Sequence, residues 1–138
     1  GRAEAALVRT SRYGDGWLPY MYTAEHLRDS VVRIAELRAE YGRTEPVRTG
    51  LFIFFCVHPN RETAVQMAVR RLSKQYAQDF SPLVGKYALA GTPDDVVAQL
   101  QPYLAAGAST VVLASVCDND YIDENHRLLA AEVLPAFR

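Results

Sequence analysis

The chain has 138 residues, of which 49% are hydrophobic and 22% are charged. This composition is typical of a globular protein, because a chain this apolar can offset its ordering entropy by burying side chains. The formal net charge of -1 leaves no basic surplus for binding phosphate backbones, and no apolar run reaches the roughly 18 to 20 residues of a membrane span. We therefore expect neither nucleic acid nor membrane as a partner.

Two cysteines, Cys56 and Cys117, each end an apolar run. Two thiols in such surroundings are typical of reduced core residues, whereas disulfide frameworks use more cysteines at regular spacings. The cysteine pattern therefore favours a cytoplasmic protein.

The first elements expected are a helix over residues 3–13, ended by Gly14, and a brief strand within residues 15–20. Thr23 is expected to cap a long helix that ends at Gly42. Its apolar residues recur at steps of three and four, as in an amphipathic helix: Leu27, Val31, Ile34, Leu37 and Tyr41.

Residues 51–57 are apolar on both faces, which is typical of a strand buried in a parallel sheet. After His58, Asn60 is expected to cap a third helix with one apolar stripe. The stripe comprises Val65, Val69, Leu72 and Tyr76.

Residues 80–91 lack a clear period and are expected to form an ordered loop. Thr92 and Pro93 indicate a helix start, and Gly107 the end of that helix. A third strand is expected over residues 110–116. Asp118 or Asp120 should then cap a final helix, which carries the apolar residues Ile122, Leu129, Val133 and Phe137.

Helices thus alternate with three buried strands, which predicts an α/β fold with parallel strands and right-handed crossovers. A closed TIM (β/α)8 barrel needs about 200 residues or more. We therefore expect residues 1–138 to be a single segment that forms part of such a barrel.

Four passages, taken in order, resemble a known family. They are the opening residues 1–7, residues 12–19 with Gly14-Asp15-Gly16-Trp17, the helix start at residues 91–93, and residues 105–113. Together they resemble the C-terminal part of the luciferase-like monooxygenase family. The resemblance implies a (β/α)8 barrel enzyme that uses reduced FMN or the deazaflavin coenzyme F-420 on a small organic substrate.

The resemblance also implies that a Gly-Gly pair precedes the first helix, with Gly1 as its second glycine. A glycine lets backbone amides approach a phosphate, a helix N-terminus offers unpaired N–H groups, and Arg2 adds a positive charge. We expect Gly1, Arg2 and Ala3 to bind the cofactor phosphate. The alternative is that these residues are only a frayed terminus.

Other candidate side chains lie at expected strand ends. Trp17 and Tyr20 could form an aromatic wall for a ring cofactor or substrate, or could pack in the core. His58 and Asn60 could reach the same region, although a helix cap accounts for Asn60. Residues 117–120 contain potential metal ligands, but no histidine has suitable spacing, so we expect a helix cap and no metal.

Two classes of function remain open. The first is an oxidoreductase of which this chain is the C-terminal segment, inactive by itself because the catalytic acid and base lie elsewhere. The second is a noncatalytic α/β binding or assembly domain. In either case an open parallel wall exposes strand edges and apolar side chains, so we expect a homo-oligomer or association with the missing half of the barrel.

Overall fold

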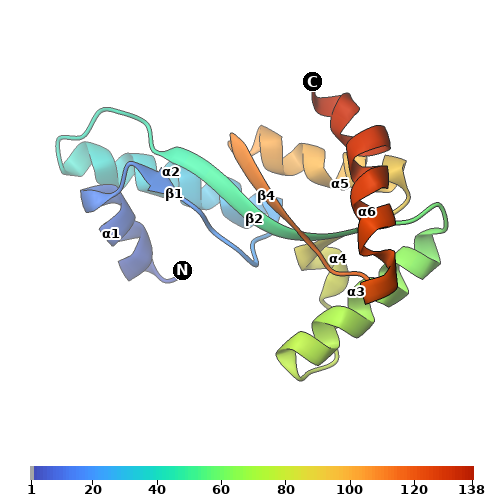
Figure 1. The fold of residues 1–138 in the computed structure, drawn as a ribbon. Coiled ribbons are helices and arrows are strands. Elements are labelled where there is room, and N and C mark those ends of the chain that lie inside the picture. The colour runs from blue at the N-terminus through green and yellow to red at the C-terminus, as the bar shows by residue number, and fades with distance from the viewer. Residues whose placement is uncertain (1) are drawn as a thin grey trace. The chain divides into compact units, whose positions relative to one another are not determined.

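The structure is a computed structural model that describes residues 2–138 (Figure 1). The chain forms two compact units. The first unit runs to Phe52 and includes Pro102–Val112, and the second comprises Ile53–Gln101 and Leu113–Arg138.

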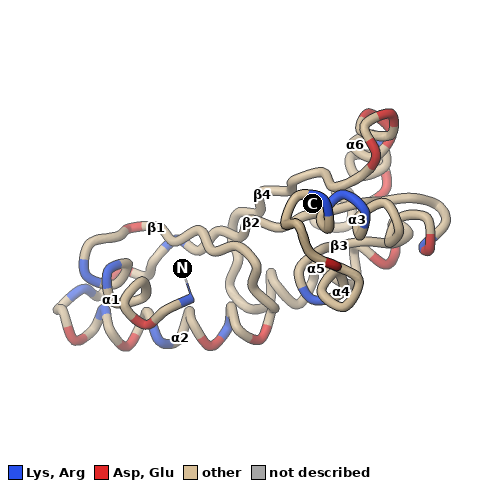
Figure 2. The backbone as a smooth tube through the Cα atoms, turned by 90° about the horizontal axis from the view of Figure 1, so that it is seen from below, with Lys and Arg blue, Asp and Glu red and all other residues tan. Residues whose placement is uncertain are grey.

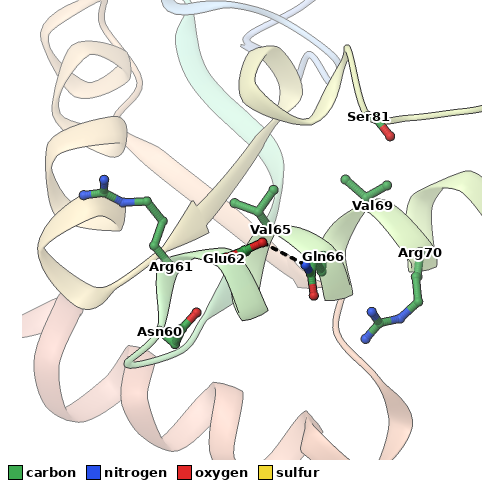
Figure 3. A pocket seen from close by; sticks show the side chains of 8 residues that line it. All are labelled: Asn60, Arg61, Glu62, Val65, Gln66, Val69, Arg70 and Ser81. Carbon is green, nitrogen blue, oxygen red and sulfur yellow. Dashed lines mark hydrogen bonds between the residues drawn. The ribbon is translucent and has the colours of Figure 1, made fainter.

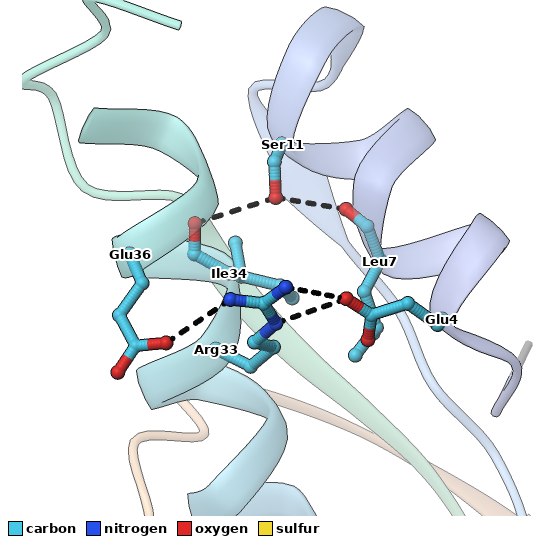
Figure 4. A network of polar contacts seen from close by, with 6 residues as sticks. All are labelled: Glu4, Leu7, Ser11, Arg33, Ile34 and Glu36. Atoms are coloured by element: carbon cyan, nitrogen blue, oxygen red, sulfur yellow. Dashed lines mark hydrogen bonds and ion pairs between the residues drawn. The ribbon is translucent and has the colours of Figure 1, made fainter. Parts of the chain in front are cut away.

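Two helices form one layer of the first unit. Helix α1 (Glu4–Tyr13) is followed by Gly14, and α2 (Ala24–Glu40) starts after Thr23, whose side chain accepts the backbone N–H of His26. Both helices and the expected cap are confirmed. The buried Ser11 hydroxyl faces the carbonyl oxygens of Leu7 in α1 and Ile34 in α2, at 2.8 and 3.3 Å (Figure 4). These contacts join the two helices where their apolar stripes meet.

The strands of the first unit are parallel. Strand β1 (Gly16–Trp17) pairs with β2 (Arg48–Val57) in the register Gly16↔Arg48 and Trp17↔Thr49, and an isolated parallel bridge joins Tyr20 to Phe52. Strand β4 (Thr110–Ser115) also pairs with β2, beginning where the Ser109 N–H donates to the Thr49 carbonyl. Trp17 and Leu51 are buried, as expected of strands covered by helices.

The second unit continues the parallel pairing. Strand β3 (Ala88–Gly91) pairs with the end of β2 from Phe54↔Ala88 to Val57↔Gly91. The Val116 N–H, just after β4, donates to the Phe55 carbonyl. Residues later in β4 therefore bond to residues later in β2, so the two strands run parallel. The predicted α/β fold with parallel strands is confirmed.

Helices surround these strands in the second unit. Helix α3 (Arg61–Tyr76) begins after Asn60, whose side chain accepts the Thr63 N–H, so this cap is also confirmed. Helix α5 (Pro93–Ala105) starts with the expected Thr92 cap, which accepts the Asp95 N–H. The C-terminal region is helical, with α6 (Ile122–Leu128) between a 3-10 turn (Asn119–Tyr121) and the last turns (Leu129–Phe137).

Three details of the prediction were wrong. Residues 80–91 contain a short helix α4 (Val84–Tyr87) and the strand β3, whose four residues are all buried. The buried stripe of α3 comprises Ala64, Met67, Ala68 and Leu72 rather than the predicted stripe around Val65 and Val69, because small alanines let the helix approach its neighbours closely. Neither Asp118 nor Asp120 caps the final helix with its side chain.

Candidate functional site

The N-terminus of α1 is the predicted phosphate site. Gly1 lies outside the described residues. Ala3 is the N-cap residue, and no side chain of the described chain caps the first turn. An uncapped N-terminus leaves backbone N–H groups to be satisfied by water or by a ligand. This is the backbone geometry that an anion requires.

Arg2 lies beside the loop that follows β1. Its guanidinium donates to the Met21 carbonyl and sits 5.9 Å from the centre of the Tyr22 ring. The hydrogen bond to Met21 and the contact with the Tyr22 ring position the guanidinium group. Arg2 is therefore held beside the start of α1 by Met21 and Tyr22, and its role in binding a phosphate stays a prediction.

The loop from Tyr20 to Tyr22 was not identified from the sequence. Met21 has φ 58°, a left-handed conformation that is uncommon for a residue with a side chain. Tyr22 is 2% exposed, its ring packs edge-on against Trp17 at 5.4 Å, and its carbonyl accepts the Tyr103 hydroxyl at 2.8 Å. These contacts hold Met21 in its strained conformation, so the Met21 carbonyl points at Arg2.

The two predicted aromatic residues behave differently. Trp17 is 7% exposed and packs in the core, which agrees with its alternative interpretation. Tyr20 is 49% exposed, with its ring 6.2 Å from Phe52 and nearly perpendicular to it. Of the two, Tyr20 is the one whose surface a ligand could reach.

Charges around α1 are balanced locally. Glu4, in the first turn, would oppose an anion, but the Arg33 guanidinium donates two hydrogen bonds to it, at 2.7 and 2.9 Å (Figure 4). Arg33 also contacts Glu36 at 3.3 Å. Figure 2 shows basic and acidic residues interspersed along α1 and α2. Arg33 thus offsets the acidic charge nearest the expected phosphate.

A second cluster, in the second unit, lies at the end of β2. The Asn125 side chain accepts the Val57 N–H at 2.6 Å, and the Tyr121 hydroxyl donates to the Val57 carbonyl at 3.0 Å. Burial, and then the nearby Glu124 carboxylate, raise the pKa of Tyr121 to about 12. The His58 ring lies 5.2 Å from the Tyr121 ring. The sequence indicated His58 at this strand end, but no pattern identified Tyr121 or Asn125.

Residues 117–120 do not form the expected cap. Asp118 pairs with Arg70 at 2.8 Å, and Asn119 accepts from Arg71 at 3.3 Å. Cys117 and Cys56 are buried free thiols, and burial raises the pKa of Cys56 to about 12. A thiol with so high a pKa is a poor nucleophile.

A pocket of about 750 Å³ lies along α3 (Figure 3). Val65 and Val69 line it, with Arg61 and Arg70 toward its two ends and Ser81 facing them from the following segment. Between these ends, the Gln66 side chain donates a hydrogen bond to the Glu62 carboxylate. Because the two arginines already pair with Asp95 and Asp118, the pocket presents little uncommitted charge.

Within residues 2–138, no group of three or more His, Cys, Asp or Glu residues could hold a metal ion. No helix in the same range is long and apolar enough to cross a membrane.

Parallel strands joined by helices define an α/β protein. The family model described as luciferase-like monooxygenase matches residues 1–110. The chain therefore belongs to the luciferase-like monooxygenase family. No match was found among curated proteins.

Solved structures support the same fold. The coenzyme F420-dependent tetrahydromethanopterin reductase of Methanopyrus kandleri is 16% identical, with a TM-score of 0.71 over 100% of this chain and 50% of that one. Monooxygenase RslO1 from Streptomyces bottropensis is 15% identical, with a TM-score of 0.72 over 100% and 46%. An F420-dependent secondary alcohol dehydrogenase is 16% identical, with a TM-score of 0.75 over 97% and 46%.

The chain thus spans about half the length of these structures, which are TIM-barrel proteins of the luciferase-like type. At such low identity the likeness concerns the fold. The predicted parallel-stranded fold class and family are both confirmed.

Proposed function

We propose that this chain is the C-terminal segment of a luciferase-like oxidoreductase that uses reduced FMN or coenzyme F-420 on a small organic substrate. The observation that carries the proposal is the uncapped α1 N-terminus beside an Arg2 held by Met21 and Tyr22. Membership of the family, whose solved neighbours include F420-dependent enzymes and an FMN complex, supports a cofactor of this kind.

The residues of α1 fit the phosphate end of such a cofactor. The first-turn N–H groups and the Arg2 guanidinium supply hydrogen-bond donors, and Arg33 offsets the charge of Glu4. The exposed ring of Tyr20, at the end of the β1 segment, offers an apolar surface nearby in the same unit. The bound cofactor would supply the reducing electrons, while this chain binds and orients it.

The substitution Arg2→Ala in the full-length protein tests the phosphate role. We expect it to weaken binding of the preferred coenzyme by about 1.5 to 3 kcal/mol, the range for hydrogen bonds to charged groups. Binding is measured by absorbance after incubation with FMN or F-420 and desalting, and by fluorescence titration. The control is Arg9→Ala, which removes an exposed arginine from the body of α1. Equal affinities of the two variants would assign Arg2 a purely structural role.

A noncatalytic α/β binding or assembly domain is the second candidate. The exposed apolar residues of the first unit, Leu18, Tyr20 and Val112, favour a partner surface. If the full-length protein binds neither coenzyme but assembles through these residues, this second function is correct.

A further inference from the structure

The loop between β1 and α2 is anchored at both of its ends. Tyr20 forms the isolated parallel bridge with Phe52, and the Thr23 side chain caps α2. Met21 and Tyr22 connect these two anchors. Met21 has φ 58°, a left-handed conformation that costs free energy for a residue with a Cβ atom. The loop therefore needs contacts with other parts of the fold to keep this conformation.

Tyr103 supplies such a contact from the last turn of α5. Its hydroxyl donates to the Tyr22 carbonyl at 2.8 Å, although Tyr22 lies 81 positions earlier in the chain. Tyr103 is 7% exposed and Tyr22 is 2% exposed, so this hydrogen bond is largely shielded from water. The hydroxyl thus fixes the backbone next to Met21, and the edge-on contact of the Tyr22 ring with Trp17 fixes the side chain.

The backbone that carries Tyr103 is held in turn. The Tyr103 carbonyl accepts the Ala108 N–H at 3.1 Å in the turn that ends α5. The Ser109 N–H and hydroxyl then both donate to the Thr49 carbonyl of β2, at 2.8 and 3.0 Å. This stretch of the chain lies in the same compact unit as the loop. The Tyr103 hydroxyl therefore reaches Tyr22 from a fixed position within the first unit.

Arg2 contacts the two residues that Tyr103 holds in place. The Met21 carbonyl accepts from the Arg2 guanidinium, whose central carbon lies 5.9 Å from the centre of the Tyr22 ring. The direction of a carbonyl changes with the φ and ψ angles of its residue. Without the Tyr103 hydroxyl, Met21 can relax to a less costly conformation that turns its carbonyl away from Arg2.

We propose that Tyr103 is a positioning residue for the coenzyme phosphate, acting through Met21 on Arg2. This inference rests on the proposed function and assigns control of its phosphate contact to a side chain on another helix. The cost of the Met21 conformation is similar in size to one hydrogen bond, so loss of the hydroxyl shifts part of the molecules to loop conformations that release Arg2. The apparent affinity falls by the fraction of molecules that remain able to bind.

The substitution Tyr103→Phe removes the hydroxyl and keeps the buried ring. Ser11→Ala is the matched control, because it also removes a buried hydroxyl that contacts a backbone carbonyl of the first unit at 2.8 Å, in this case within α1. FMN and F-420 are each titrated into the full-length wild type by fluorescence, and the tighter-binding coenzyme is then titrated into the variants. We expect Tyr103→Phe to weaken binding about fivefold and Ser11→Ala to stay within about twofold.

The double variant Arg2→Ala/Tyr103→Phe tests the route through Arg2. If Tyr103 acts through Arg2, Tyr103→Phe should change the affinity less than about 1.5-fold once the guanidinium is absent, because residues that act together are not additive in a double-mutant cycle. Equal losses with and without Arg2, an unchanged affinity in Tyr103→Phe, or a fivefold loss in Ser11→Ala would overturn the inference.

NMR without coenzyme separates this inference from the proposed function. NOEs between the Arg2 side chain and the Tyr22 ring should be present in wild type and Ser11→Ala and lost in Tyr103→Phe. If neither coenzyme binds to wild type while Tyr103→Phe loses these NOEs, the proposed function fails and the positioning of Arg2 by Tyr103 stands. If the NOEs persist in Tyr103→Phe, the inference fails, whether or not a coenzyme binds.

Discussion

Asn125 is a fully buried polar side chain that satisfies the Val57 N–H at 2.6 Å and the Ser115 hydroxyl at 2.8 Å. We expect Asn125→Ala to lower the free energy of unfolding by about 1 to 3 kcal/mol, because a buried N–H is left without an acceptor. Urea denaturation of wild type and variant measures the difference. Asn119→Ala is the control, since Asn119 is exposed and its loss should cost under about 0.5 kcal/mol. Equal effects of the two substitutions would contradict the role given to Asn125.

Asp95 makes stability depend on pH. Two hydrogen bonds from the Arg61 guanidinium, at 2.7 and 2.6 Å, and one from the Thr92 N–H hold the pKa of this carboxyl well below its usual range. A lowered folded-state pKa means that the stabilisation is present above the unfolded-state pKa of about 4 and is lost as pH falls through the folded-state value. Asp95→Asn should therefore be less stable than wild type at neutral pH, and the difference in free energy of unfolding between the two proteins should become smaller in acid.

Urea midpoints at pH 7 and pH 3 measure that difference. Asp94→Asn, at the exposed neighbouring position, is the matched control and should change little at either pH. Arg61 is 70% exposed on its side chain, so added salt should also reduce the difference. A gap between wild type and Asp95→Asn that is the same at both pH values would show that the ion pair does not contribute.

At the scale of the element, the C-terminus of α3 offers a stabilising change. Ala77 ends the helix with φ 52° and ψ 39°, and its N–H donates to the Ser73 carbonyl. Glycine adopts this left-handed conformation without the steric penalty of a Cβ atom, but it also gains conformational freedom in the unfolded chain. We expect the first effect to exceed the second, so that Ala77→Gly stabilises the protein by about 0.5 to 1 kcal/mol.

Thermal unfolding tests this substitution against Ala98→Gly. Ala98 is exposed in the middle of α5, where the backbone is right-handed and glycine should cost about 0.5 to 1 kcal/mol. The two Ala→Gly changes should thus shift the melting temperature in opposite directions. Destabilisation by both would mean that the left-handed end of α3 is not retained in solution.

At the scale of the whole molecule, exposed strands predict association. In the first unit, β1 and β4 each pair only with β2 among residues 2–138, and Leu18, Tyr20 and Val112 are 57%, 49% and 41% exposed. Unpaired strand edges and apolar surface, at about 25 cal/mol per Å², favour covering by another chain. We expect this polypeptide to sediment as a dimer or larger species at micromolar concentration.

Leu18→Ser should shift that equilibrium toward the monomer. Val32→Ser is the matched control, because Val32 is 54% exposed on α2, away from the strand edges. Analytical ultracentrifugation of the two variants and wild type measures the effect. A folded wild-type chain that remains strictly monomeric would refute the expectation.

Local patterns were sufficient for most elements. The steps of three and four that include Leu27, Ile34 and Leu37 predicted α2, and Thr23, Asn60 and Thr92 are the helix caps that their positions indicated. A helix cap uses atoms within three residues, so its signal is visible in the sequence. The same holds for the buried strand β2, whose apolar run is long and continuous.

Short elements, and residues whose burial or partner depends on distant parts of the chain, were not predictable in this way. Strand β3 has only four residues, and its strand conformation depends on pairing with β2. On α3, Val65 and Ala64 are adjacent in the sequence, and the contacts of the helix decide which of them is buried. Asp118 could have capped a helix, but Arg70, 48 residues away, provides its partner.

The sequence by itself determined the order of helices and strands, the parallel α/β class, the family and the helix end that we assign to the cofactor phosphate. Only the tertiary structure decided that Met21 orients Arg2, that Trp17 is buried while Tyr20 is exposed, and that Asn125 and Tyr121 fix the strand end before His58. The reason is physical: periodicity and capping arise from neighbours along the chain, whereas these contacts join residues 19 to 68 positions apart and depend on how the elements pack.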